Sequence, residues 1–284
     1  MRINIFITIL LMLGFISCVD VINLDLPEKD KRLVVEGLIT NWDTVYTVKL
    51  SKTSKYSFKI NDASNEMESG AMVIISDDTG ISDTLHEVNA GIYQTIPPYI
   101  HGIVGRTYKL DIFTASGKHY ISAPEKMTHA PKIDSIYFER DPNDRIRNGY
   151  KNTIYLDWQD PSDTANYYLQ HFSYFWGNQW HPENEWNRLF SDNMFNGQYV
   201  RKYIASTGHD MYGFYVRITR YSLSKRAYEF WNLLNQQLYP TDDGVVTSSV
   251  PLVGNIYNAE NSDDFALGYF QVSGKVIAQV YIDH

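Results

Sequence analysis

The sequence predicts a mostly β protein, with a β-sandwich in its N-terminal part and a second β-rich domain that carries one helix. The first observation is composition: tyrosine occurs 22 times, and aromatic and charged residues make up 14% and 20% of the 284 residues. Such a balance is typical of β structure. The second observation is a series of short runs that alternate polar and apolar residues between turn signals. The third is that a single stretch has helical spacing of its apolar residues.

The first domain is predicted over residues 32–126. Asp-Asp-Thr-Gly at 77–80 and Asn-Ala-Gly at 89–91 are turn signals between consecutive runs, and the polar stretch 61–70 is predicted to be a loop. Seven short strands within one such span indicate a β-sandwich. The predicted strands are residues 33–40, 46–51, 71–76, 84–88, 92–95, 107–113 and 119–123.

The second domain is predicted over residues 132–284. Pro124 and Pro131 mark the junction, because proline cannot continue the hydrogen-bond ladder of a sheet interior. Asp-Pro-Asn-Asp at 141–144 is predicted to be a turn. The strands predicted in this domain are residues 133–139, 152–158, 166–172, 212–221 and 275–282.

One helix is predicted, over residues 223–238 approximately. Ser222 is its predicted N-cap, and Pro240 ends it. Its apolar residues recur at helical spacing, which indicates a face that packs on the core. They are Ala227, Phe230, Trp231, Leu234 and Leu238.

Residues 173–199 are rich in aromatic side chains interleaved with Gly, Asn and Asp, and neither a period of 3.6 nor one of 2.0 persists. One interpretation is a long loop folded over the sandwich as a local core. The other is a recognition surface for a sugar or a membrane partner, because rigid aromatic residues are favoured at binding hot spots. The candidate recognition residues are Tyr174, Phe175, Trp176, Trp180, Trp186 and Phe190.

Residues 1–17 have the pattern of a secretory signal peptide: a positive Arg2, a short apolar core and the small Ser17. Cys18 follows, the only cysteine of the chain, and we expect it to be the acylated first residue of a lipoprotein. Two or three acyl chains anchor a protein stably without a spanning helix. Residues 18–31 are predicted to be a tether, because they are charged and contain a proline.

The net charge of −8 argues against a nucleic-acid partner, since phosphate binding needs clustered Lys and Arg. No phosphate-binding loop, His-Glu-x-x-His, Gly-x-Ser-x-Gly or cysteine pair occurs, and the eight histidines are scattered. We therefore expect no cofactor, no metal site and no catalytic residue. The adjacent acids Asp77 and Asp78, with the pairs at 242–243 and 263–264, are predicted to shape turns.

The chain resembles known proteins at two levels. The strand and glycine-turn patterns at 70–75, 78–80, 91–93 and 105–110 resemble the transthyretin-like or peptidase-regulatory-like modules of bacterial surface proteins, which have an Ig-like sandwich. Over the whole chain, Cys18 and several later stretches resemble a Bacteroidota lipoprotein family known as domain of unknown function 4249. Those later stretches are residues 22–27, 33–40, 46–53, 254–256 and 267–270.

The family resemblance implies an outer-membrane lipoprotein that assists a TonB-dependent receptor in nutrient or metal uptake, and we expect it to face outward. The module resemblance implies a spacer or docking role. On both grounds we expect a non-catalytic accessory or ligand-binding subunit, whose partners are the membrane, such a receptor and a small ligand or glycan. Two alternatives stay open: a glycan-active or glycan-binding surface protein, whose carboxylates need not be close in sequence, and a structural envelope protein.

Overall fold

The computed structural model describes residues 31–42, 44–53, 66–97, 100–146, 149–162, 164–209, 213–238, 252–261 and 263–283. Within strands, only the backbone is described at residues 141–146, 149–151, 183–187 and 206–209. Eighteen strands and one helix occur in the described ranges, so the mostly β class is confirmed. The predicted signal peptide with Cys18, and the tether apart from Lys31, lie outside them.

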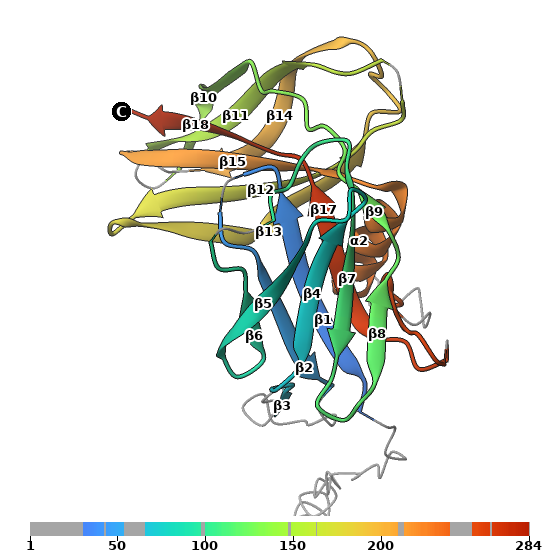
Figure 1. The fold of residues 1–284 in the computed structure, drawn as a ribbon. Coiled ribbons are helices and arrows are strands. Elements are labelled where there is room, and N and C mark those ends of the chain that lie inside the picture. The colour runs from blue at the N-terminus through green and yellow to red at the C-terminus, as the bar shows by residue number, and fades with distance from the viewer. Residues whose placement is uncertain are drawn as a thin grey trace, which may run out of the picture. The chain divides into compact units, whose positions relative to one another are not determined.

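The largest sheet has eleven strands and contains all seven strands predicted in the first domain (Figure 1). Its order is β16-β8-β7-β4-β5-β6-β2-β1-β17, with β3 beside β2 and β9 beside β7. The bounds are β1 (Leu33–Thr40), β2 (Thr47–Lys52), β3 (Glu66–Met67), β4 (Met72–Asp77), β5 (Ser82–Asn89), β6 (Ile92–Gln94), β7 (Thr107–Phe113), β8 (His119–Ser122), β9 (Glu125–Lys126), β16 (Ile256–Asn258) and β17 (Leu267–Ser273).

This sheet is completed by strands from the end of the chain. β17 pairs in parallel with β1 from Val34–Leu267 to Thr40–Ser273, and β16 pairs with β8. Figure 1 shows β17 beside β1, although the two strands come from opposite ends of the sequence. Ile256, Ala266 and Phe270 accordingly lie in the same buried core as Val35 and Leu110. The division at 126–132 remains a prediction, and these pairings cross it.

Two smaller sheets pack on a second core. One has the order β10-β11-β14 and the other β13-β12-β15-β18. Buried Ile154, Leu156 and Trp158 of the first meet Phe172, Val216 and Ile218 of the second. The bounds are β10 (Ser135–Ile146), β11 (Gly149–Gln159), β12 (Tyr167–Trp176), β13 (Gln179–Ser191), β14 (Tyr199–His209), β15 (Phe214–Leu223) and β18 (Lys275–Ile282).

The turn predicted at 141–144 is wrong. These residues lie inside β10, where the pairing with β11 shifts register between Arg140 and Arg145. Such an irregularity leaves backbone groups unpaired, and it therefore accommodates Pro142, which has no N–H to donate.

The one described helix is α2 (Lys225–Leu238), close to its predicted span. Its predicted N-cap is wrong by two residues: the Ser224 hydroxyl accepts the Ala227 amide at 3.1 Å. The Ser222 hydroxyl instead donates to the Thr128 carbonyl at 2.7 Å and accepts from the Gly274 amide. Ala227 and Phe230 of the predicted apolar stripe are buried against Leu169 and Leu223. Trp231 and Leu234 pack on the same cluster, so the stripe is core packing as far as Leu234, whereas Leu238 is 60% exposed. Pro240 lies outside the described residues.

Candidate functional site

The aromatic segment 173–199 is not a long loop. Its first part is a β-hairpin in which β12 ends at Trp176 and β13 begins at Gln179. The connecting residues Gly177 and Asn178 have φ angles of 57° and 66°. Two successive left-handed residues make the tight turn that matches the twist of paired strands, and Gly and Asn are the residues that adopt it most easily.

The hairpin places the predicted recognition residues on opposite faces. Tyr174 and Phe190 face the three-stranded sheet and pack against the second core. Phe175 and Trp180, which are cross-strand partners, lie on the other face with their ring centroids 5.3 Å apart. This split follows from the two-residue period of a strand. Because Tyr174 and Phe190 face the core, the six predicted recognition residues do not form a single surface.

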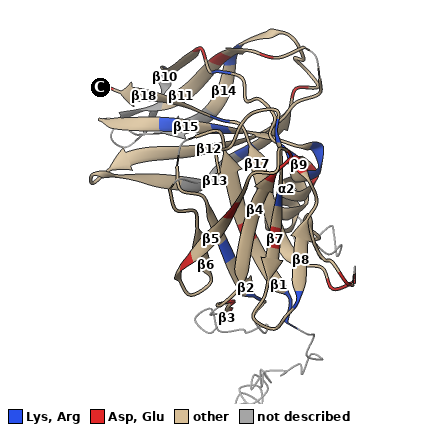
Figure 2. Ribbon diagram, viewed as in Figure 1, with Lys and Arg blue, Asp and Glu red and all other residues tan. Residues whose placement is uncertain are grey.

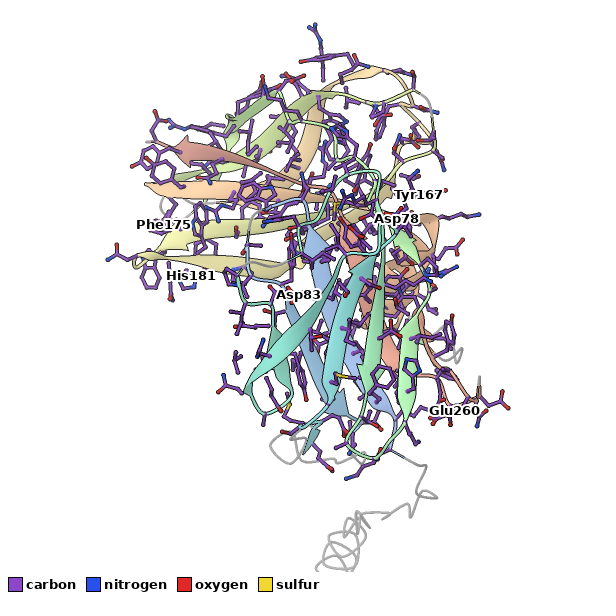
Figure 3. The ribbon with its side chains drawn as sticks, in the orientation of Figure 1. Asp78, Asp83, Tyr167, Phe175, His181 and Glu260 are labelled. Atoms are coloured by element: carbon purple, nitrogen blue, oxygen red, sulfur yellow. The ribbon has the colours of Figure 1, made fainter. Side chains whose placement is uncertain are left out.

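Two further candidates lie near the turn and in β13. Trp176 is 61% exposed, and the side chain of Trp186 lies outside the described residues. His181 stacks on Tyr174, and its Nε2 lies 3.1 Å from the Trp176 carbonyl oxygen, to which it donates a hydrogen bond. Figure 3 shows Phe175 and His181 near the turn and Tyr167 at the opposite end of the hairpin.

Phe175 and Trp180 lie beside two cations and a third aromatic ring. The guanidinium carbon of Arg217, on β15, lies 3.6 Å from the ring centroid of Trp180. The ammonium of Lys275, on β18, lies 4.8 Å from the ring centroid of Trp42, whose indole N–H donates to the Lys275 carbonyl at 3.0 Å. We call these five residues the cation–aromatic face.

The two cations of the cation–aromatic face are held where water is partly excluded. Burial lowers the pKa of Arg217, and burial together with the charge of Arg217 lowers the pKa of Lys275. With its amide oxygen turned inward, Gln279 accepts from Arg217 Nη2 at 3.0 Å and Nε at 3.1 Å. Partly desolvated cations over ring faces attract an anionic or polar guest more strongly than solvated ones.

Three of the four strands of this sheet carry no acidic residue, whereas β13 contains Glu183 and Glu185. The three strands β12, β15 and β18 contain no Asp or Glu, in a chain whose net charge is −8. In Figure 2 these strands have no red segment, which would mark Asp or Glu, and β15 has a blue segment, which marks Lys or Arg. Helix α2 covers the other end of the same face, at Leu169 and Leu223. The exposed remainder therefore suits a partner that presents carboxylates or polar groups.

The opposite face of the same sheet buries a cation. Arg220 is fully buried, and its guanidinium carbon lies 4.0 Å from the ring centroid of Trp158, 5.6 Å from that of Tyr168 and 5.8 Å from that of Phe190. Burial lowers its pKa to about 10. Phe195, from the linker between β13 and β14, packs edge-on against Trp158 at 5.6 Å.

Two buried carboxylates lie in the same region with partners of their own. Asp160 accepts from the Tyr168 hydroxyl at 3.1 Å and the Gly197 amide at 3.2 Å, and burial raises its pKa. Asp192 accepts from the Asn166 amide at 2.9 Å and the Asn166 side chain at 3.1 Å. Neither carboxylate forms an ion pair with Arg220.

The acidic turns behave as the sequence predicts. Asp77 accepts hydrogen bonds from the Thr79 amide and hydroxyl, from the Ile81 amide and from Arg106 Nη1 at 2.6 Å. Asp264 pairs with Lys118 at 2.8 Å, while the acids at 242–243 lie outside the described residues. Over the described ranges, no cluster of three or more His, Cys, Asp or Glu is placed to hold a metal ion.

The sequence identified two of the five residues of the cation–aromatic face. Phe175 and Trp180 stand out as aromatic residues in an unusual segment. Trp42, Arg217 and Lys275 carry no local signal, because strand pairing brings them together from three distant stretches of chain.

Among the described helices, none has the length and apolar character to cross a membrane. No curated protein matches the sequence. A family model does match it, from the residue after Cys18 almost to the end of the chain. That model covers residues 19–276, and the chain therefore belongs to the family described as domain of unknown function (DUF4249).

Proposed function

We propose that the protein is a non-catalytic lipoprotein of the outer membrane of a Bacteroidota bacterium, anchored through an acylated Cys18 and facing outward. We propose further that it is an accessory subunit of a TonB-dependent receptor for nutrient or metal uptake. The signal-like residues 1–17, followed by the single cysteine Cys18, support the anchor. An anchor confines the protein to the plane of its partner, so that weak contacts become productive.

The cation–aromatic face is the observation that carries the docking proposal. Its rings are rigid, its two cations are partly desolvated, and strands β12, β15 and β18 contribute no carboxylate. Aromatic and Arg side chains of this kind dominate the binding energy of protein interfaces. The partner surface that fits it is acidic, and we propose that it belongs to the receptor. The eleven-stranded sheet, which we propose to be transthyretin-like, then serves as the spacer between anchor and docking face.

The test is a mild detergent extraction of the tagged native protein, followed by mass spectrometry of its N-terminus and of what comes with it. We expect an acylated Cys18 and a stoichiometric TonB-dependent receptor. The double variant Trp180→Ala with Arg217→Gln should lose the receptor but keep the acylation. Lys225→Gln on α2 is the control, because its side chain is 72% exposed and lies outside the cation–aromatic face. An acylated protein that is extracted alone would contradict the docking.

A glycan-binding function is the second candidate, because several aromatic rings are exposed near the same end of the sheet. Trp176, Tyr215 and Tyr281 are 61%, 50% and 47% exposed, and the rings of the last two lie 4.9 Å apart. Exposed rings are the platforms on which sugar faces pack. Binding of neutral oligosaccharides that Tyr215→Ala abolishes, without a co-extracted receptor, would favour this candidate over docking.

A further inference from the structure

Arg220 is a buried cation that no described residue satisfies. It has no accessible surface, and its Nε, Nη1 and Nη2 atoms all lack a hydrogen-bond partner. The aromatic rings around it stabilise the charge from their faces but accept no hydrogen bond in the guanidinium plane. Buried polar groups in native proteins almost always have a partner, and an unpaired one points to a water, an ion or a ligand.

The unpaired groups around Arg220 are mostly donors. Besides its three nitrogens, Trp158 Nε1 is buried without a hydrogen bond, although it lies near Asp160. The only neighbouring acceptor left over among the described strand residues is Gln170 Oε1, directly across from Arg220 in the β12–β15 register. A water would satisfy Gln170, but the three guanidinium nitrogens, all donors on one positive charge, favour a guest with several acceptor oxygens and a negative charge.

The nearby carboxylates do not fill this role. Asp160 is held by Tyr168 and Gly197, and Asp192 by Asn166. Arg220 therefore lacks the bidentate partner that a guanidinium ordinarily has when it is buried.

We propose that the Arg220 region is a binding site for a small carboxylate anion, held between the two smaller sheets by the guanidinium beside the Trp158 ring. The site lies on the inner face of the sheet whose outer face carries the cation–aromatic face, and it is independent of docking there. Phe195 packs on Trp158 from a linker and not from a strand.

The experiment follows the indole N–H resonances of the mature chain labelled with ¹⁵N-tryptophan, with Trp158→Phe to identify the signal of Trp158. Titrations use sodium acetate, acetamide, which has the same shape without the charge, and sodium chloride at the same ionic strength. We expect acetate alone to shift the Trp158 signal saturably. Arg220→Met should weaken this binding at least tenfold, and Arg217→Met, which removes a cation from the outer face, should leave it unchanged.

Two results would overturn the proposal. One is a Trp158 signal that acetate does not move, or that acetamide moves equally, which would mean that water alone occupies the region. The other is a shift that persists in Arg220→Met. The comparison of acetate with acetamide needs only the unmodified chain, so it decides the matter even if Arg220→Met does not fold.

Discussion

At the scale of single residues, this protein places ionisable groups where their neighbours fix one protonation state. His171, on β12, is largely buried beside the Tyr221 ring at 5.2 Å, and burial lowers its pKa to about 4. Asp77 shows the opposite balance: burial raises its pKa, but hydrogen bonds from Thr79, Ile81 and Arg106 outweigh it and hold the pKa below its usual range. Both groups make stability depend on pH.

His171 predicts a loss of stability in mild acid. Between pH 6.5 and 4 the unfolded chain binds a proton at this residue and the folded chain does not, so the free energy of unfolding falls as the pH falls. Over that interval the loss is about 2–3 kcal/mol. Urea denaturation of His171→Phe should lack this slope. His86→Gln, at an exposed position, should keep it, and an equal slope in His171→Phe would show that another group is responsible.

We expect the hydrogen bonds of the Asp77 carboxylate to stabilise the folded protein. Asp77→Ala removes acceptors for two amides and a hydroxyl and leaves Arg106 without its ion pair, at a cost of about 2–3 kcal/mol in the free energy of unfolding. Asp78→Ala is the matched control and should cost less than about 1 kcal/mol, since Asp78 accepts one amide hydrogen bond at the surface. The wild-type contribution should be present above the unfolded pKa, near pH 4, and disappear as the pH falls through the lower folded pKa. Equal losses in the two variants would show that the hydrogen bonds of Asp77 add no stability.

At the scale of elements, prediction succeeded where one face of a strand is buried and the other is polar. Residues 33–40, 107–113 and 275–282 were predicted with the bounds that β1, β7 and β18 have. Residues 166–172 were predicted as a strand, but the end of β12 and all of β13 were missed, because aromatic side chains occupy both faces there and the alternation between polar and apolar residues disappears. The signal that remained was local: Gly177 followed by Asn178, a pair that favours a two-residue turn.

We expect the stability of the protein to depend on which residue occupies the first position of the hairpin turn. Gly177→Val forces a β-branched residue into a left-handed conformation and should destabilise the protein by about 1–2 kcal/mol. Asn178→Gly places a more permissive residue at the same turn and should cost almost nothing. Thermal unfolding of both variants is the measurement, with hydrogen exchange of the β12 and β13 amides to localise the effect. A Gly177→Val protein as stable as the wild type would mean that the turn adopts another geometry.

At the scale of the whole molecule, a strand from the C-terminal part of the chain pairs with the first strand. β17 inserts beside β1, and the close approach depends on Gly268, whose φ is 84° and where an added Cβ would lie 2.0 Å from the Val35 carbonyl oxygen. This arrangement and the cation–aromatic face share one property. Each is assembled from residues far apart in sequence, which is why local patterns predicted β1 but neither its parallel pairing with β17 nor three of the five face residues.

We expect a single methyl group added at Gly268 to lower the free energy of unfolding strongly. Gly268→Ala should cost about 3 kcal/mol or more, because the methyl meets backbone atoms that cannot move without breaking the β1–β17 ladder. Gly80→Ala has nearly the same φ, 88°, with nothing within 4 Å, and should cost about 1 kcal/mol. Both variants place alanine in a left-handed conformation, but only Gly268→Ala also meets backbone atoms. Comparing the melting temperatures of the two variants therefore distinguishes the steric clash from the backbone strain. Similar losses would show that β17 is not held tightly against β1.

Docking of the cation–aromatic face on a membrane receptor is the central proposal, and in-cell photocrosslinking tests it most directly. A photoreactive phenylalanine derivative replaces Tyr215, which is 50% exposed beside that face, and in a second strain replaces Glu229 on α2 as the control. Docking predicts one crosslinked adduct with a TonB-dependent receptor from position 215 and none from position 229. No adduct at 215, or the same adduct from both positions, would contradict it.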